Sequence, residues 1–353
     1  MSLTEELTLV IGVAAVVVTL VVGFKRELGQ LTGKLFGKKQ PPAPPATPGK
    51  RLVHIGLVLN GDMPYSRRLM ETFRSKVEEL LDPTLHFPHF EVAHGCPESG
   101  EEAEQKNRAV FNELLSRFGR PPMYLVTFGT EVSVYAHRRH STIPLIFVGV
   151  TDPHASGLIP LPGDGQTRGL IAGATYGKDM NDRVAVIARL FPQARLGFVY
   201  NSALAQDRIA LEKTRAAVRM MTPSPMLIEI ETRQPALTPQ QLGSADVFFG
   251  WSYLTQNFGQ FARDAHKPFV GVSLEDVLRF AVAAVSADES EIGRRAASEI
   301  LVKNLIEGVP LRDMDILQVE ENLRIWNVAR ARRFDYSLPD KDKKEWVVID
   351  DPY

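Results

Sequence analysis

Short apolar runs alternate with amphipathic segments along most of this chain, and this alternation constrains its fold more than any other feature. The predicted strands, which are apolar and bounded by turn residues, are residues 52–60, 123–129, 143–150, 194–201, 225–231, 246–252 and 268–273. The predicted helices, which repeat apolar side chains at helical spacing, are residues 66–81, 179–191, 206–221 and 289–308. In the first helix, the spacing places Leu69, Phe73, Val77 and Leu80 on one face. Strand–helix alternation favours an α/β fold with parallel sheets covered by helices, and the number of units favours two sheets.

The length and composition are those of an ordinary globular protein. With 353 residues, the chain can form two compact domains with additional segments. A net charge of −1 provides no basic face for nucleic acid, so we expect no nucleic-acid partner. A single cysteine, Cys96, excludes an internal disulfide and a cysteine-rich metal site.

Several predicted strands end in polar residues, most clearly in the stretch LIFVGVTDPHASGL at residues 145–158. In open parallel sheets, ligands bind beyond the carboxyl ends of the strands. We therefore predict that a small molecule binds at residues that follow the strands, namely Asn60, Ser66, Thr127, Thr130, Thr151, Asp152, Tyr200, Asn201, Ser202, Gln206, Asp207, Trp251, Tyr253 and Ser273. The alternative for each position is a turn or a helix cap, because Ser, Thr, Asn and Asp are the usual capping residues.

The motifs of common catalytic and cofactor sites are absent from the sequence. There is no GxxxxGK[ST] loop, no GxGxxG after the first strand, no HExxH and no GxSxG. The HRRH stretch at residues 137–140 is typical of a solvated helix end rather than of a metal site. We therefore expect no enzymatic activity, no catalytic residues, no metal site and no cofactor.

Residues 7–24 form an uncharged, apolar stretch that is long enough to cross the hydrocarbon core of a membrane as a helix. A buried core helix is one alternative, but a helix that is apolar on every face is rare in a soluble domain. A cleavable signal peptide is another, but residues 1–6 carry two glutamates and no basic residue. We predict an uncleaved transmembrane anchor at residues 1–26, followed by a basic, proline-rich linker at residues 27–50.

The charges that flank the apolar stretch bear on which side of the membrane the rest of the chain lies. Five Lys and Arg residues follow it within residues 25–39, whereas two glutamates precede it. Lys and Arg near a membrane span usually stay on the cytoplasmic side. The flanking charges therefore favour a cytoplasmic location for the globular part.

Four stretches of the globular part resemble sequence patterns of one known family. They are IFVGVTDPHASGL at residues 146–158, RVAVIARLFPQARLGFVYN at 183–201, FAVAAVSADESEIGRRAASEILVKNLIEGVPLRD at 280–313 and LRIWNVARARRFDYSLP at 323–339. In this order, they resemble the substrate-binding proteins of ABC transporters whose studied members bind tryptophan and other aromatic amino acids. The resemblance covers residues 52–339.

The resemblance implies the type I fold of periplasmic binding proteins, in which two Rossmann-like lobes joined by a hinge close on a ligand. It implies that lobe 1 comprises residues 51–165 and 280–310. Lobe 2 would comprise residues 166–279 and 311–339, and residues 340–353 would form a tail. The ligand would lie between the lobes against the strand ends, and an ABC permease would be the partner.

The loops differ from the family pattern at three places. Gln206 and Asp207 stand where relatives often carry Asn-Ser, and Tyr253 stands where they usually carry an acidic residue that can hold a ligand amine. The first loop places Arg67 and Arg68 after its proline. Because an unpaired amine is costly to bury, these differences favour an anionic or aromatic ligand, or none, over an amino acid.

Two functions are compatible with the sequence. The first is a membrane-anchored module, similar to a solute-binding protein, for ABC-type uptake or for sensing. The second is a degenerate binding fold that acts as an accessory or interaction subunit of a membrane complex. Either would be a single-pass protein of the bacterial inner membrane. The family resemblance implies a periplasmic globular domain, whereas the flanking charges favour the cytoplasmic side.

Overall fold

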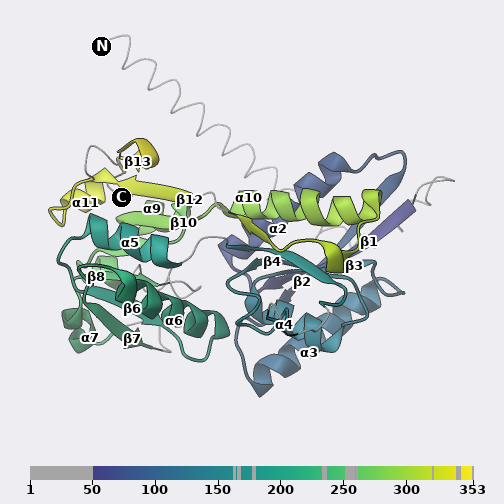
Figure 1. Ribbon diagram of the computed structural model, residues 1–353, viewed down its shortest axis with the longest axis horizontal. Coiled ribbons are helices and arrows are strands. Elements are labelled where there is room, and N and C mark those ends of the chain that lie inside the picture. The colour runs from purple at the N-terminus through teal and green to yellow at the C-terminus, as the bar shows by residue number, and fades with distance from the viewer. Residues whose placement is uncertain are drawn as a thin grey trace, which may run out of the picture. The chain divides into compact units, whose positions relative to one another are not determined.

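The computed structural model describes most of the chain after residue 50. The described residues are 51–161, 164, 168–176, 180–232, 237–250, 259, 261–319, 322–338 and 343–351. They belong to one compact unit that contains two β-sheets (Figure 1). The predicted anchor and linker, at residues 1–26 and 27–50, lie outside this set. None of the helices among the described residues combines the length and the apolar composition that a membrane span requires.

The described strands of the first sheet run parallel in the order β11-β5-β4-β3-β1-β2. Their bounds are β1 Arg51–Asn60, β2 His86–Gly95, β3 Tyr124–Phe128, β4 Leu145–Val150, β5 Ile171–Tyr176 and β11 Leu317–Val319. Strands β3 and β4 are buried along their whole length, as expected of parallel strands covered on both faces. Because the strands are parallel, the loops that follow β1, β3 and β4 share one edge of the sheet.

Helices cover both faces of this first sheet. α2 (Pro64–Leu80) and α10 (Glu289–Arg295), which continues into η1 (Ala296–Glu307), pack on one face (Figure 1). α3 (Glu101–Arg117) and α4 (Thr130–Arg139) pack on the other face. These elements together form lobe 1.

The buried face of α2 follows the predicted helical spacing with one exception. Leu69, Phe73 and Val77 are fully buried. The spacing also places Leu80 on this face, but Leu80 is 36% exposed because the helix ends at this residue. The chain then turns Leu81 into the core instead, where it is 3% exposed.

The second sheet has the order β13-β12-β10-β9-β8-β6-β7 and is parallel except between β10 and β12. Its strands are β6 Leu196–Tyr200, β7 Leu227–Glu231, β8 Val247–Gly250, β9 Phe269–Gly271, β10 Ala283–Ala287, β12 Asn322–Asn327 and β13 Val347–Ile349. Helices α5 (Met180–Leu190), α6 (Ala205–Met220) and α11 (Val328–Arg332) pack on one face. Helices α7 (Pro239–Ser244) and α9 (Leu274–Arg279) pack on the other, and these elements form lobe 2. Two short 3-10 turns, η2 (Leu311–Asp313) and η3 (Lys343–Glu345), complete the described elements.

The chain crosses from one sheet to the other after β5, after β10 and after β11. The lobe boundaries predicted after residues 165, 279 and 310 each move towards the C-terminus. Strand pairing is the reason, since β5 pairs with β4 in the first sheet, β10 pairs with β9 in the second, and β11 pairs with β5 in the first. Connections of this kind between two sheets can act as hinge segments.

Part of the predicted tail belongs to the second sheet. Strand β13 pairs in parallel with β12 at the edge. The indole ring of Trp346 packs edge-on against that of Trp326, with ring centroids 6.1 Å apart. The side-chain Nδ2 of Asn327 donates a hydrogen bond to the carbonyl oxygen of Asp351 at 3.0 Å. Residues 343–351 are therefore a folded part of lobe 2.

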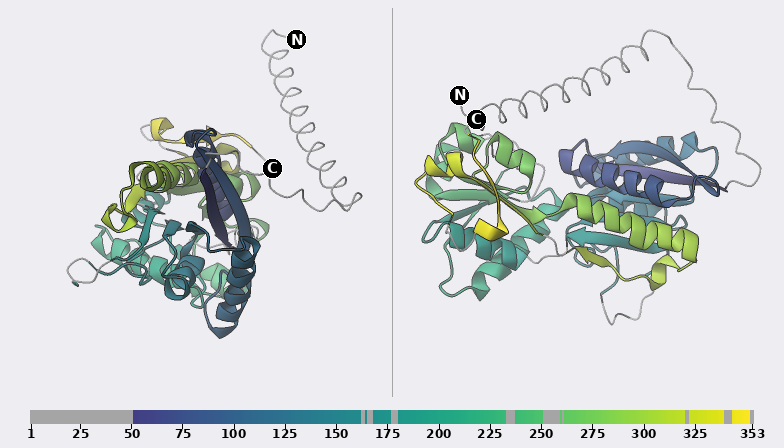
Figure 2. Two further views of the ribbon diagram at one scale, coloured as in Figure 1. Left: turned by 90° about the vertical axis from the view of Figure 1, so that its right-hand side faces the viewer. Right: turned by 90° about the horizontal axis from the view of Figure 1, so that it is seen from above.

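Helix α10 follows a strand of the second sheet but packs on lobe 1. Figure 2 shows α10 lying beside α2 in the view from above. A Cβ atom at Gly293 of α10 would lie 2.2 Å from Thr72 Oγ1 and 2.6 Å from the carbonyl oxygen of Leu69. Glycine at this position therefore permits the close approach of the two helices.

Candidate functional site

A cleft of about 600 Å³ lies between the two lobes. Lobe 1 contributes the N-terminal half of α3, helix α4 and the turn after β4, and lobe 2 contributes the first residues of α6. The charged or polar side chains that line it include Glu98, Glu104, Thr130, Glu131, Arg138 and Arg208. The volume is in the range of small-molecule sites in proteins. The segments that follow β2, β3 and β4 contribute to the lobe 1 wall. Of the predicted ligand-binding residues that the structure describes, only Thr130 lines the cleft.

Glu131, in the first turn of α4, joins the two lobes at this cleft. Its carboxylate Oε2 accepts a hydrogen bond from Asn60 Nδ2 at 3.0 Å, at the end of β1 in lobe 1. Its Oε1 accepts a hydrogen bond from the backbone N–H of Gln206 at 3.4 Å, in the first turn of α6 in lobe 2. The side chain of Glu131 is only 7% exposed. Burial raises the pKa of Glu131, although the Asn60 amide and nearby backbone N–H groups favour the charged carboxylate.

The local backbone explains why Glu131 meets Asn60. The residue before α4 is Gly129, with φ of 111° and ψ of 170°, a conformation that is essentially restricted to glycine. A Cβ atom at Gly129 would lie 2.6 Å from Asn60 Cβ. The glycine therefore lets α4 begin directly against the end of β1, which places Glu131 on the Asn60 side chain.

Three polar side chains, those of Asn60, Tyr65 and Ser66, are buried side by side next to Glu131. Burial is the main cause that raises the pKa of Tyr65 to about 12, and the carboxylates of Glu131 and Glu289 act in the same direction. Of the predicted ligand-binding residues, Asn60 at the end of β1 and Ser66 near the start of α2 lie together here.

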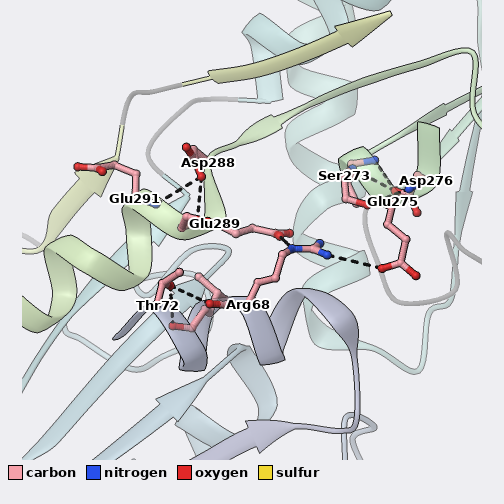
Figure 3. A network of polar contacts seen from close by, with 11 residues as sticks. Arg68, Thr72, Ser273, Glu275, Asp276, Asp288, Glu289 and Glu291 are labelled. Carbon is pink, nitrogen blue, oxygen red and sulfur yellow. Dashed lines mark hydrogen bonds and ion pairs between the residues drawn. The ribbon is translucent and has the colours of Figure 1, made fainter. Parts of the chain in front are cut away.

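Arg67 and Arg68, which the sequence places in a loop, lie in the first turns of α2 and are held in ion pairs. Arg67 Nε donates to Asp62 Oδ1 at 2.6 Å on the surface. Arg68 Nε donates to Glu289 Oε2 of α10 at 2.6 Å, and Arg68 Nη1 lies 3.6 Å from Glu275 Oε2 of α9 in lobe 2. Figure 3 shows Arg68 extended between these two carboxylates. The argument for an anionic ligand from Arg67 and Arg68 therefore does not hold, because both cations already have carboxylate partners.

Asp152, which follows β4, stabilises a turn through one carboxylate oxygen and contacts lobe 2 through the other. Its Oδ1 accepts hydrogen bonds from the backbone N–H groups of His154 at 3.0 Å and Ala155 at 2.9 Å. Its Oδ2 lies 2.8 Å from Lys213 Nζ of α6. Burial acts to raise the pKa of Asp152, but Lys213 and the two backbone N–H groups outweigh it and lower the pKa. The backbone N–H of neighbouring Thr151 donates to Thr130 Oγ1 at 3.4 Å.

The other predicted ligand-binding side chains in the described part make mostly local contacts. Thr127 Oγ1 and Ser133 Oγ are 2.8 Å apart, and both are buried. Asn201 Oδ1 accepts from the backbone N–H of Ala203 at 2.9 Å, and Ser202 Oγ donates to Glu231. The Asn201 contact is a turn, as in the alternative given for these residues, whereas Thr127 and Ser202 pair with other side chains.

Five further predicted residues complete the set. Asp207 Oδ2 accepts from the backbone N–H of Asn201 at 2.8 Å, and Ser273 Oγ accepts from that of Asp276 at 3.1 Å as a helix cap. The ring of Tyr200 stacks on Phe198, with centroids 6.3 Å apart. Trp251 and Tyr253 lie outside the described residues.

Sequence reasoning did not single out Glu131, Tyr65 or Glu289. Glu131 follows Gly-Thr at the end of a strand, and an acidic residue in the first turn of a helix is common because it favours the helix dipole. Its contacts with Asn60 and Gln206 span 71 and 75 residues of sequence. No local pattern signals contacts over such distances. Among the described residues, no group of three or more His, Cys, Asp or Glu side chains could hold a metal ion.

Comparison with known proteins gives matches in structure only. No protein-family model matches the chain, and no curated protein matches its sequence. An ABC domain in complex with L-Trp from Streptococcus pneumonia is 15% identical, with a TM-score of 0.68 over 84% of this chain and 100% of that chain. A conserved domain protein from Vibrio cholerae is 18% identical, with a TM-score of 0.68 over 84% of this chain and 99% of that chain.

A third solved structure is the ligand-free, open form of a substrate-binding protein with adhesive properties from Clostridium difficile. It is 15% identical, with a TM-score of 0.59 over 84% of this chain and 99% of that chain. The fold is that of a type I periplasmic binding protein. The resemblance to substrate-binding proteins of ABC transporters is thus confirmed at the level of the fold. Solute-binding proteins and regulators of the LacI type both have this fold.

Proposed function

We propose that this chain is a membrane-anchored solute-binding module that takes up a small molecule between its lobes, for ABC-type uptake or for sensing. The observation that carries the proposal is the cleft of about 600 Å³, which has walls from both lobes and lies at the carboxyl ends of the strands of the first sheet. A ligand that contacts both walls would favour the closed arrangement of the lobes. The three chain crossings supply the segments about which the lobes would move.

The anchor in this proposal is the apolar stretch at residues 7–24, which is long enough to span a membrane. The side of the membrane decides between the two uses of the module. A periplasmic domain could deliver solute to an ABC permease, whereas a cytoplasmic domain would sense an internal solute. A reporter fused after Tyr353 that is active on only one side of the membrane distinguishes the two.

Binding is best tested with a solute panel and a matched pair of variants in α6. Ile209 lines the cleft, whereas Ala216 is exposed on the same helix outside it. We expect at least one solute to raise the melting temperature of the full-length wild type and of Ala216→Trp, but not that of Ile209→Trp, in which the indole fills the cleft. No response of the wild type to a broad panel would overturn the proposal. Equal binding by Ile209→Trp would move the ligand out of this cleft.

A second candidate function is that of an accessory subunit in a membrane complex. The observation that favours it is that hydrogen bonds and ion pairs of the protein connect the lobes without a ligand, between Glu131 and Gln206, Asp152 and Lys213, and Arg68 and Glu275. Purification of the full-length protein in a mild detergent tests this candidate. A stoichiometric partner would support it, and a lone monomer that binds a solute would exclude it.

A further inference from the structure

Three helix N-termini at the cleft lack a side-chain cap. The N-cap residues of α3, α4 and α6 are Gly100, Gly129 and Leu204, and none of them accepts a hydrogen bond from its own helix through a side chain. The first turn of each helix contributes to the wall of the cleft. The first N–H groups of a helix have no partner within the helix, and together with the helix dipole they favour an anion.

At two of these N-termini an anion is already present, and it comes from the chain itself. The carboxylate of Glu131 accepts a hydrogen bond from the N–H of Gln206 in the first turn of α6. Burial raises the pKa of Glu131, and the backbone N–H groups of Ala205 and of Glu131 itself oppose this effect by favouring the charged carboxylate. The carboxylate therefore lies among N–H groups of α4 in lobe 1 and of α6 in lobe 2, as the anionic group of a ligand would.

The surroundings hold this carboxylate in place. Asn60 is fully buried and donates an Nδ2 hydrogen to Glu131 Oε2. The Glu131 side chain is 7% exposed, so it does not extend into solvent. The neighbouring Gly129 leaves no room for a Cβ atom beside Asn60. An incoming anion would have to displace Glu131 from this position.

We propose that Glu131 is a built-in ligand: its carboxylate occupies an anion-binding site formed by the N-termini of α4 and α6. Occupation of this site by Glu131 holds the two lobes together. It follows that a solute bound in the cleft carries no carboxylate or phosphate at this end. This consequence for the class of ligand rests on the proposed solute-binding function. The occupation of the anion-binding site by Glu131 does not depend on that function.

Chemical rescue of a truncated side chain tests the proposal in the full-length protein. Glu131→Ala removes the carboxylate from the anion-binding site, and we expect the melting temperature to fall by at least about 2 °C. Sodium acetate should then raise it back towards the wild-type value, because acetate can occupy the vacated site. The uncharged analogue acetamide, at the same concentration, should have no such effect. Wild type and Glu131→Gln should respond to neither compound, since their own side chains still fill the site.

Glu104→Ala is the matched control, because Glu104 lines the same cleft but forms a partly exposed ion pair with Arg139 of α4. Glu104 also lies in the first turn of a helix, α3, but its carboxylate pairs with the side chain of Arg139 rather than with backbone N–H groups of a second helix, so acetate should not stabilise Glu104→Ala selectively. If Glu131→Ala does not fold, refolding in acetate and in acetamide replaces the melting experiment, and acetate alone should restore the folded protein.

Two results would overturn the proposal: equal effects of acetate and acetamide on Glu131→Ala, or an acetate effect of the same size on Glu104→Ala. The probe is acetate alone. The outcome is therefore independent of whether the solute panel identifies a ligand, and failure of this inference is distinguishable from failure of the proposed function.

Discussion

Two of the contacts between the lobes differ in their physical nature. Glu131 of α4 is 7% exposed and binds an amide side chain of its own lobe and a backbone N–H of the other. On the other face of the first sheet, the side chains of Arg68 and Glu275 are 34% and 33% exposed, and their charged atoms are 3.6 Å apart. The first contact depends on the fixed directions of backbone groups. The second depends on charge in a partly solvated setting, where water and salt weaken it.

The largest effect should follow from Gly129→Ala, which acts on the buried contact through the backbone. The substitution forces an L-residue into a glycine conformation and brings a Cβ atom to 2.6 Å from Asn60 Cβ. We expect a loss of at least about 1–3 kcal/mol in the free energy of unfolding, measured by urea denaturation. Gly119→Ala is the control, because Gly119 also has a positive φ, of 66°, but no atom within 4 Å of the added Cβ. Equal losses in the two variants would mean that the Asn60 contact contributes nothing.

A pH profile should reveal the buried carboxylate through the sign of its effect. Burial holds the pKa of Glu131 above its ordinary value. The folded state therefore binds the proton more tightly than the unfolded state, and protonation favours folding. Relative to Glu131→Gln, the wild type should be more stable near pH 4 than at pH 7, and this advantage should fall as pH rises through the folded-state pKa. A difference that is constant with pH would contradict the buried environment.

An exposed ion pair within lobe 2 should give the opposite sign. Hydrogen bonds from Arg195 lower the pKa of Asp246 from 3.8 to about 2. The stabilisation by Asp246 is therefore present above its unfolded-state pKa and is lost as pH falls through about 2. Relative to Asp246→Asn, the wild type should be more stable at pH 7 and lose this advantage in acid. Denaturation curves for both variants over the same pH range would show the crossing trends.

The smallest effect should come from Glu275→Gln at the partly exposed contact. Exposed ion pairs contribute about 0.2–1 kcal/mol, and salt screens them. We expect a loss in this range at low ionic strength that disappears in about 0.5 M salt. Glu275 also pairs with Arg279 of its own helix, at 3.0 Å. A double-mutant cycle with Arg68→Met isolates the contact between the lobes, and a loss that is insensitive to salt would show that the contact is not ionic.

The periodicity of the sequence predicted the architecture and many of its elements, because buried strands and amphipathic helices carry local signals. It predicted helices α2, α5, α6 and α10 and strands such as β1, β3 and β4 within a few residues. Strand β2, HFPHFEVAHG, was not predicted, since it is an edge strand with a proline and mostly half-exposed residues. Strand β13 was missed because three residues provide no periodicity.

The site was predictable only as a location. Segments after β2, β3 and β4 do reach the cleft, since parallel strands place their carboxyl ends together, but of the predicted residues that the structure describes only Thr130 lines it. The sequence could not tell which polar side chains turn back to cap a helix, as Ser273 does, and which face the other lobe, as Glu131 does. That choice depends on how α4 and α6 meet, and residues far apart in the chain determine it.

Neither sheet is completed by the part of the chain that begins it. The first sheet receives β11, at residues 317–319, and the second receives β12 and β13, which end at residue 349. During synthesis, the N-terminal half of the chain therefore leaves the ribosome before either sheet has its last strand. The edge of β5 in the first sheet and the edge of β10 in the second therefore stay without their native partner strands until residues 317–349 have been synthesised.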